Sequence, residues 1–363
     1  MSQRFFSGKD RYYQLDRWLF GRKVMVVCGS SYQHIRKTKD IIDSHDNIVY
    51  FRHFNPNPVY ESVVEGVNIF NKEHCDAIVA VGGGSAIDVA KCIKLFHCMD
   101  PTQSYLKQPI TANDIPLLVV PTTAGTGSES TRYAVIYLDG IKQSITSDYC
   151  IPETVLLDPD NLNTLPEYQR KATMMDTLAH ALESMWSINS SPESMEYSKK
   201  ALELFIQNKD GYLKNTYSGN KGMQMAANIA GKAINITQTT AGHAMSYKIT
   251  SMFGCAHGHA AMLCNRALFP WMLGHMDRCI DPRGKNYLEG VFCQISRSIE
   301  TSGAEEASIK IVELFDMLSL NTPRATPEQI GELSMSVSVD RLKNNPVELC
   351  NEDLILLYHQ ILC

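Results

Sequence analysis

Short apolar runs alternate with helix-like patterns through the first 160 residues of the chain. The runs at 23–28, 77–81 and 117–120 are rich in β-branched residues and are bounded by Gly or Pro. Runs that are apolar at every position are typical of strands buried on both faces of a parallel sheet, with helices covering each face. The pattern therefore predicts an α/β domain at this end of the chain.

One further run predicts a separate antiparallel hairpin. The segment 133–138 is followed by Asp139-Gly140 and then by the segment 142–145. Asp-Gly is a favoured two-residue hairpin turn because both positions tolerate a positive φ.

The pattern changes after Asp158-Pro159, where long amphipathic segments replace the strand-like runs. Pro166 opens a helical pattern, and Ser191-Pro192 and Thr326-Pro327 are typical helix starts, with a hydroxyl cap followed by proline. The polar segment 218–222 is predicted to be a loop between two helices. We expect an α/β domain over residues 1–160 and an all-α domain over residues 161–363.

Composition excludes several classes of protein. Lys and Arg number 34 against 39 Asp and Glu, a net charge of −5, so no overall positive field would attract nucleic acid or an anionic membrane. No segment reaches the roughly 20 apolar residues that span a bilayer, and the first residues lack a secretory pattern, so we expect a cytoplasmic protein. The 11 cysteines include no C-x-x-C pair, which favours reduced thiols over disulfides or a zinc finger.

A glycine loop follows the second apolar run. Gly82-Gly83-Gly84-Ser85 lies between that run and a helical pattern that reaches Lys91. Glycines let backbone N–H groups approach a phosphate, and a helix N-terminus adds unpaired donors, so the loop suits a pyrophosphate. The alternative is a tight strand-to-helix turn without a ligand.

A second loop of small and hydroxyl residues, 121–129, follows the third run. In an open parallel sheet both loops would lie at the carboxyl edge of the strands, where such sheets bind ligands. Together they favour a shared dinucleotide crevice over two unrelated turns.

Four side chains form a candidate metal site. Asp176 and His180 are four residues apart in a helical pattern, so both project from one face, and His243 and His257 follow among small residues. One carboxylate and three imidazoles make a ligand set for a divalent first-row metal. An Asp–His pair at this spacing alone is more often a simple hydrogen-bonded pair.

These motifs, in this order and at this spacing over residues 20–270, resemble the iron-containing, or group III, alcohol dehydrogenases. The resemblance implies a Rossmann-like dinucleotide-binding domain, a helical domain similar to dehydroquinate synthase, a metal that is Fe(II) or Zn(II), and at least a homodimer. Carried over by position, the implied metal ligands are Asp176, His180, His243 and His257. The implied cofactor contacts are Gly83, Gly84 and Ser85 at the pyrophosphate, Asp88 at the nicotinamide, and Thr122, Thr123 and Thr126 at the adenosine and ribose.

The chain departs from the family pattern at two positions. Tyr247 stands where many members have a second histidine close to the catalytic centre, so a phenol is predicted to take part in proton transfer. Around Gly29 there is no carboxylate of the kind that binds the adenosine ribose in NAD-using members, which leaves room for NADPH as well as NADH.

The reaction implied is hydride transfer between the nicotinamide and the carbon of a small aldehyde whose oxygen the metal polarises. The hairpin and the segment 246–259 resemble the branch that reduces phosphonoacetaldehyde to 2-hydroxyethylphosphonate. Arg132, Lys142 and His259 are candidate donors to a phosphonate, with His259 also a candidate catalytic residue. Three alternatives stay open: a short-chain aldehyde or diol enzyme such as a lactaldehyde reductase, a dehydroquinate synthase-like lyase, and a non-catalytic nucleotide sensor.

Overall fold

The computed structural model describes residues 3–362, which divide into two compact units. The first unit comprises the residues up to Thr123 together with Gly127–Leu165. The second comprises Ala124–Thr126 and the chain from Pro166 onward. The chain therefore enters the second unit for three residues before returning to the first.

The first unit is built on a six-stranded sheet in the order β1-β8-β5-β4-β2-β3, and every neighbouring pair is parallel. The central strands are apolar throughout and buried at every position, as their sequences predicted. The short outer strands have less continuous runs and were not expected. The strands are β1 (Arg4–Phe6), β2 (Val24–Cys28), β3 (Ile48–Phe51), β4 (Ala77–Gly82), β5 (Leu117–Pro121) and β8 (Thr154–Leu156).

Helices cover both faces of this sheet. Alternate residues of the central strands pack with α3 (Tyr60–Lys72) and α4 (Gly84–Phe96) in one apolar cluster. The intervening residues pack in a second cluster with α1 (Arg11–Leu19) and α2 (Arg36–Asp43). This two-sided burial explains why the strand sequences show no polar alternation.

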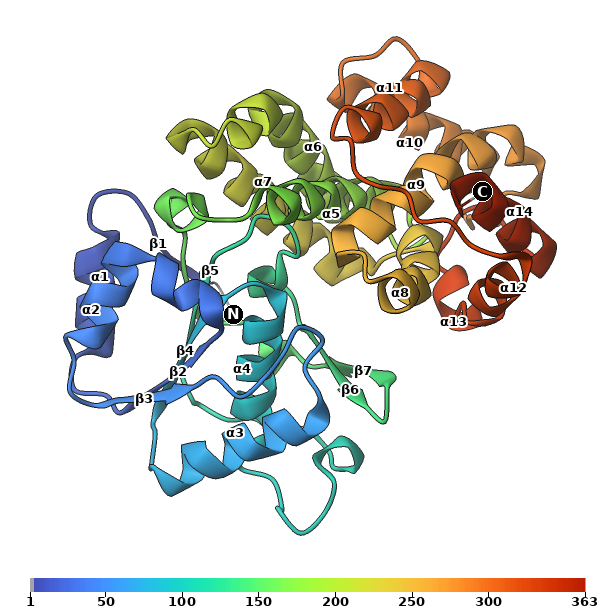
Figure 1. Ribbon diagram of the computed structural model, residues 1–363. Helices are drawn as coiled ribbons and strands as arrows, with labels where there is room; N and C mark the ends of the chain where they lie inside the picture. Colours follow the sequence, from blue (N-terminus) through green and yellow to red (C-terminus); the bar gives the residue numbers. More distant parts are fainter. Residues whose placement is uncertain (1–2, 363) are drawn as a thin grey trace. The chain divides into compact units, whose positions relative to one another are not determined.

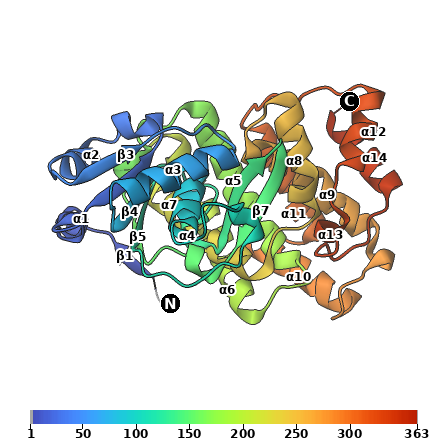
Figure 2. The same ribbon diagram turned by 90° about the horizontal axis from the view of Figure 1, so that it is seen from below.

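The predicted hairpin is confirmed. Strands β6 (Tyr133–Leu138) and β7 (Ile141–Thr146) pair antiparallel, and Asp139 and Gly140 between them both have positive φ. The helix α4 lies between the hairpin and the six-stranded sheet (Figures 1 and 2).

The second unit is helical, and the helix with the most buried residues is α5 (Glu167–Trp186), which contacts α6, α7, α8, α9 and α10. The predicted starts at Pro192 and Pro327 are confirmed, each with a capping box on the preceding hydroxyl residue. The remaining helices are α6 (Pro192–Leu213), α7 (Tyr217–Thr237), α8 (Ala241–Phe253), α9 (His257–Gly274), α10 (Lys285–Ser298), α11 (Ala304–Asp316), α12 (Pro327–Met335), α13 (Val339–Leu342) and α14 (Asn351–Leu362).

The loop predicted at residues 218–222 is wrong, because this segment lies in the first turns of α7. Its glycines serve close helix packing and do not form a turn. A Cβ at Gly219 would lie 2.1 Å from the backbone of Gly211 on α6, and one at Gly222 would lie 2.0 Å from the side chain of Asn208. The true turn lies just before α7, with Asn215 at positive φ and Thr216 as the cap.

All cysteines among residues 3–362 are free thiols, as expected. No helix in that part of the chain is long and apolar enough to cross a membrane.

Candidate metal centre and cofactor loops

The helix α5 carries Asp176 and His180 on one face, and both side chains are buried. The Nε2 atom of His180 lies 3.8 Å from the Oδ1 atom of Asp176. His243 lies in the first turn of α8, and His257 is the first residue of α9. Two helix N-termini therefore place imidazoles beside the carboxylate of α5.

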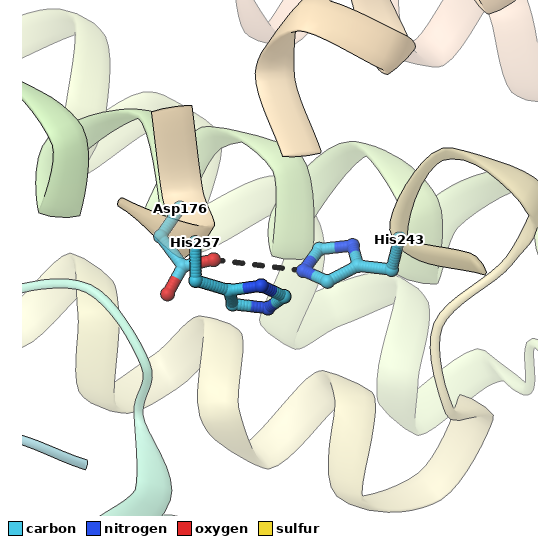
Figure 3. Close-up of side chains that lie close together, drawn as sticks. All are labelled: Asp176, His243 and His257. Carbon is cyan, nitrogen blue, oxygen red and sulfur yellow. Dashed lines mark ion pairs between the residues drawn. The ribbon is translucent and has the colours of Figure 1, made fainter. Parts of the chain in front are cut away.

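Three of the predicted ligands converge. One donor atom from each of Asp176, His243 and His257 lies within 4.8 Å of the others. Figure 3 shows the carboxylate of Asp176 and the two imidazoles turned toward one another, with His243 Nε2 at 3.5 Å from Asp176 Oδ1. This is a group of one oxygen and two nitrogen donors.

Glycines next to the two histidines allow the close approach of their helices. A Cβ at Gly258 would lie 2.3 Å from the carbonyl oxygen of Ala172 and 2.4 Å from the Cβ of Asp176, both on α5. A Cβ at Gly242 would lie 2.1 Å from the side-chain oxygen of Asn265. The pairs Gly242-His243 and His257-Gly258 are thus packing requirements of the centre.

His180 lies beside this group rather than within it. Its ring is stacked on the ring of His243, with centroids 4.6 Å apart and planes inclined by 10°. The role of His180 as a fourth ligand stays a prediction.

The donors fit a divalent metal. Asp176 Oδ1 and His243 Nε2 are buried and have no hydrogen-bond partner among residues 3–362. Burial would raise the pKa of Asp176, but the charges of the neighbouring histidines hold it well below its usual range, so the carboxylate is ionised. An unsatisfied buried carboxylate oxygen facing imidazole nitrogens is the arrangement that Fe(II) or Zn(II) would complete.

Glu183, for which the sequence predicted no role, contacts Nδ1 of His243, whereas Nε2 of the same ring faces Asp176. The carboxylate of Glu183 lies 2.5 Å from His243 Nδ1 and is fully buried. Burial would raise the pKa of Glu183, but the charge and hydrogen bond of His243 lower it to about 2. The signal was present, because Asp176, His180 and Glu183 stand at i, i+4 and i+7 on one helix face.

The phenol predicted to take part in proton transfer lies next to His257. The rings of Tyr247 and His257 are parallel within 2°, with centroids 5.6 Å apart. Nη1 of Arg341, on α13, donates to the hydroxyl of Tyr247 at 2.8 Å. Nothing in the sequence singled out Arg341, which is 94 residues from Tyr247.

His259 is not part of the group formed by Asp176, His243 and His257. It is buried, its Nδ1 lies 3.2 Å from the hydroxyl of Tyr168, and its ring lies against Phe315. Burial lowers the pKa of His259 to about 4, so the imidazole is neutral near pH 7. This placement disfavours the charged donor role predicted for it, and a catalytic role stays a prediction.

In the first unit, the two predicted cofactor loops begin at the same level of the sheet. Gly82 at the end of β4 is in register with Pro121 at the end of β5. A Cβ at Gly83 would lie 3.2 Å from the Cγ2 of Thr123, so the loops contact each other where glycine keeps the backbone accessible. Gly84 and Ser85 follow as the first residues of α4, whose N-terminus presents unpaired N–H groups.

Asp88 and Lys91 of α4 anchor the end of the second loop and the chain that leads from it into β6. The carboxylate of Asp88 accepts hydrogen bonds from the hydroxyl of Ser128 and the backbone N–H of Val135. Lys91 is fully buried, and its Nζ donates to oxygens of Ser128, Thr131 and Tyr133 at 2.7–3.2 Å. The structure thus gives Asp88 an anchoring role, and its predicted contact with the nicotinamide is untested.

The predicted adenosine contacts divide between the units. Thr122 and Thr123 lie in the first, where Thr122 is buried and bonded through its N–H to Gly82. Thr126 belongs to the second, in the three-residue segment that packs on α5. There the hydroxyl of Thr177 donates to the carbonyl of Ala124, and a Cβ at Gly125 would lie 2.8 Å from the carbonyl oxygen of Thr173.

The predicted phosphonate donors Arg132 and Lys142 both belong to the hairpin region of the first unit. Arg132 forms an ion pair with Asp148 at 3.1 Å, with both side chains substantially exposed. Lys142 lies on β7, opposite Tyr137 of β6. Burial raises the pKa of Asp88, and the positive charge of Lys142 opposes this with a smaller effect.

Profiles of known families match both halves of the chain. Residues 2–159 match "Iron-containing alcohol dehydrogenase", and residues 171–362 match "Fe-containing alcohol dehydrogenase family, C-terminal". The chain belongs to the iron-containing alcohol dehydrogenase family. The resemblance seen in its motifs is confirmed, and the protein is an enzyme of the iron-type alcohol and aldehyde dehydrogenases.

Several named proteins are similar to it. Alcohol dehydrogenase 4 of Schizosaccharomyces pombe is 28% identical over 84% of this chain and 72% of its own. Phosphonoacetaldehyde reductase of Streptomyces viridochromogenes is 29% identical over 77% of this chain and 74% of its own.

Solved structures confirm the fold class. The sulfoacetaldehyde reductase from Bifidobacterium kashiwanohense, in complex with NAD+, is 26% identical, with a TM-score of 0.87 over 99% of this chain and 96% of its own. An iron-containing alcohol dehydrogenase from Thermococcus thioreducens shares the fold at 21% identity, with a TM-score of 0.88 over 99% of this chain and 98% of its own.

Proposed function

We propose that the protein is a metal-dependent, NAD(P)H-linked reductase of a small aldehyde with an anionic group, foremost phosphonoacetaldehyde, which it converts to 2-hydroxyethylphosphonate. The observation that carries the proposal is the converging group of the buried Asp176 and His243 and the partly buried His257, with two of its donor atoms lacking a hydrogen-bond partner in the described part of the chain. A dehydrogenase of this family needs such a group, whereas a nucleotide sensor does not.

In this proposal Asp176, His243 and His257 hold the metal, and His180 is the fourth ligand. The bound metal supplies Lewis acidity for a carbonyl oxygen. Tyr247 carries the proton that completes the alcohol, and Arg341 orients its hydroxyl. Gly83, Gly84 and Ser85 receive the pyrophosphate, while Asp88, Thr122, Thr123 and Thr126 complete the cofactor contacts.

The substrate class is supported by two similar proteins with different names. Phosphonoacetaldehyde and sulfoacetaldehyde are both two-carbon aldehydes that carry a tetrahedral anionic group. Such an anion needs cationic donors, of which Arg gives the most directional contacts. Arg341 offers a cation in the second unit, beside Tyr247, and Arg132 and Lys142 offer two in the first.

We also propose that NADPH is accepted as well as NADH. Strand β2 ends at Cys28 and continues as Gly29-Ser30, so the turn itself has no carboxylate to repel a 2′-phosphate, and the nearby carboxylate of Asp43 accepts hydrogen bonds from the hydroxyls of Tyr32 and Tyr50. Arg52 follows the neighbouring strand β3, and its guanidinium lies over the rings of Tyr32 and Tyr50. No ion pair joins Arg52 to a carboxylate within residues 3–362. A homodimer and a cytoplasmic location remain predictions from the family resemblance and the sequence.

The test is a comparison of initial rates, followed as the loss of reduced nicotinamide, for phosphonoacetaldehyde, sulfoacetaldehyde, lactaldehyde and propanal. The enzyme is loaded anaerobically with Fe(II) or Zn(II), and each substrate is assayed with NADH and NADPH. We expect the highest kcat/KM with phosphonoacetaldehyde. If lactaldehyde or propanal is the better substrate, the phosphonate assignment is wrong and the enzyme is a short-chain aldehyde reductase.

Matched variants locate the anion contact. Loss of a charge-assisted contact typically costs about 1.5–3 kcal/mol, so the variant that removes it should lower kcat/KM for phosphonoacetaldehyde roughly ten- to a hundredfold and spare propanal. Arg132→Ala and Arg341→Ala are compared with Arg297→Ala, a basic residue in the last turn of α10 that is outside the proposed site. Equal losses with both aldehydes would mean that the arginine is structural.

A further inference from the structure

We propose that Glu183 is a positioning residue of the metal centre: it fixes the orientation and tautomer of His243 and supplies the second negative charge that a buried divalent cation needs. The inference rests on the proposed metal site and adds a residue that does not itself bind the metal. The carboxylate of Glu183 is fully buried, and several hydrogen bonds converge on it.

Four donors from two elements meet at this carboxylate. Oε1 accepts from His243 Nδ1 at 2.5 Å and from the side-chain amide of Asn265 at 2.7 Å. Oε2 accepts from the backbone N–H of Thr240 at 2.5 Å and from its hydroxyl at 2.9 Å. Glu183 on α5 thereby ties together the start of α8, where Thr240 and His243 lie, and Asn265 of α9.

An ionised carboxylate can only accept hydrogen bonds, so each of these neighbours must donate. Nδ1 of His243 therefore carries a proton. When a bound metal replaces the proton on Nε2, the imidazole is neutral, keeps its proton on Nδ1 and directs its lone pair from Nε2, the atom that faces Asp176. Glu183 thus selects the tautomer whose lone pair is directed toward the donor group of Asp176 and His257.

Charge balance supports the same role. Asp176 and Glu183 contribute two negative charges in a buried region, and the imidazoles are neutral when they act as ligands. A divalent cation then brings the total to zero. A buried net charge is costly, so a centre with only one of these carboxylates would bind the cation more weakly.

Replacement of Glu183 by Gln separates these effects from simple packing, because the two side chains have nearly the same shape. The amide nitrogen of glutamine would face either the N–H of Thr240 or Nδ1 of His243, and both sites now hold donors. If the amide nitrogen faces Nδ1 of His243, two N–H donors meet, and this contact becomes a hydrogen bond only if His243 moves its proton to Nε2. That tautomer presents N–H, not a lone pair, to the metal.

The experiment measures the Zn(II) and Co(II) dissociation constants of the full-length protein by chelator competition, together with the unfolding temperature of the metal-free form. We expect Glu183→Gln to weaken binding of both metals roughly ten- to a hundredfold. The control is Ser184→Ala, the next residue on α5, which is fully buried and loses hydrogen bonds to His180, Ala181 and Ser198 without touching His243. Its metal affinity should stay within about twofold of wild type, while its metal-free form unfolds at a lower temperature.

A second measurement does not depend on the folding of a variant. The ¹⁵N spectrum of histidine-labelled, Zn(II)-loaded wild type should show His243 protonated at Nδ1, with assignment by the missing signals of His243→Asn. Full metal affinity in Glu183→Gln, or a His243 protonated at Nε2 in wild type, would overturn the positioning role while leaving the metal centre intact. A wild-type protein that binds neither metal would overturn the centre and the positioning role together.

Discussion

Each unit of the protein buries a network of charged side chains, and the two networks differ in how completely they are satisfied. Lys91 in the first unit donates to backbone and hydroxyl oxygens of three residues, and its neighbour Asp88 accepts from two more groups. In the second unit, Glu183 is equally well satisfied, but Asp176 Oδ1 and His243 Nε2 have no hydrogen-bond partner among residues 3–362.

This difference separates a structural network from a binding site. Burial lowers the pKa of Lys91 and raises that of Asp88, since both lose water, but their hydrogen bonds are made within the fold itself. Buried polar atoms nearly always form hydrogen bonds in folded proteins, so two atoms that form none at the centre of an otherwise complete network mark the place of a ligand. Substitutions in the two networks should therefore have different consequences.

The largest effect is expected at the incomplete network. His257→Ala removes one of the three converging donors, and kcat/KM should fall at least about a thousandfold, or roughly 4 kcal/mol. Metal content measured by elemental analysis should fall with it, while the unfolding free energy of the metal-free protein changes little. A variant that keeps full metal and full activity would remove His257 from the site.

A substitution in the network of Lys91 and Asp88 should lower stability and leave metal content unchanged. Lys91→Met removes the donor to oxygens of three residues and the positive charge beside Asp88, so the free energy of unfolding should fall by about 3 kcal/mol. Metal content of the folded protein should stay at the wild-type level. Denaturant unfolding and elemental analysis on the same preparations check both, and a loss of metal without a loss of stability would break the distinction between the networks.

A smaller effect is expected at the glycine loop, which Lys91 supports indirectly by holding the neighbouring loop. Gly83→Val introduces a side chain 3.2 Å from Thr123 and into the approach of the pyrophosphate, so the cofactor dissociation constant should rise at least about tenfold, or roughly 1.4 kcal/mol. Calorimetry measures it, with metal content as the control. Unchanged affinity would mean that the loop is a turn without a ligand.

The smallest effect concerns the exposed edge of the first unit. Arg52→Ala should lower kcat/KM for NADPH about fivefold and leave the value for NADH unchanged, because an exposed charge contributes little through solvent. Lys72→Ala, which removes an exposed basic side chain at the end of α3, is the matched control. A wild-type preference for NADH above roughly a hundredfold would contradict the proposed 2′-phosphate contact.

Local patterns predicted most of the fold. Fully apolar runs gave the central strands, and Asp139-Gly140 gave the hairpin because its residues adopt the positive φ that the turn requires. The same reasoning failed at 218–222, where glycine signals a turn in isolation but serves close packing of α7 on α6. A property set by a neighbouring helix is not visible in a local pattern.

The site was predictable only in part for the same reason. The spacing of Asp176 and His180 is a local helical signal, and the family motif supplied His243 and His257. Glu183 lies on the same helix face, but its role depends on Asn265 and Thr240, which are 82 and 57 residues away. The contact of Arg341 with Tyr247 depends entirely on how the C-terminal helices pack.

The three-residue excursion of Ala124–Thr126 into the second unit has a consequence for how the chain can be divided. A fragment that begins at Pro166 would lack this segment, so the hydroxyl of Thr177 would lose the carbonyl of Ala124, and the surface of α5 that Gly125 covers at Thr173 would be exposed. The helical unit therefore cannot be isolated as one continuous fragment of the chain. A chimaera between two relatives should exchange this short loop together with α5, because the loop and the helix are shaped to each other.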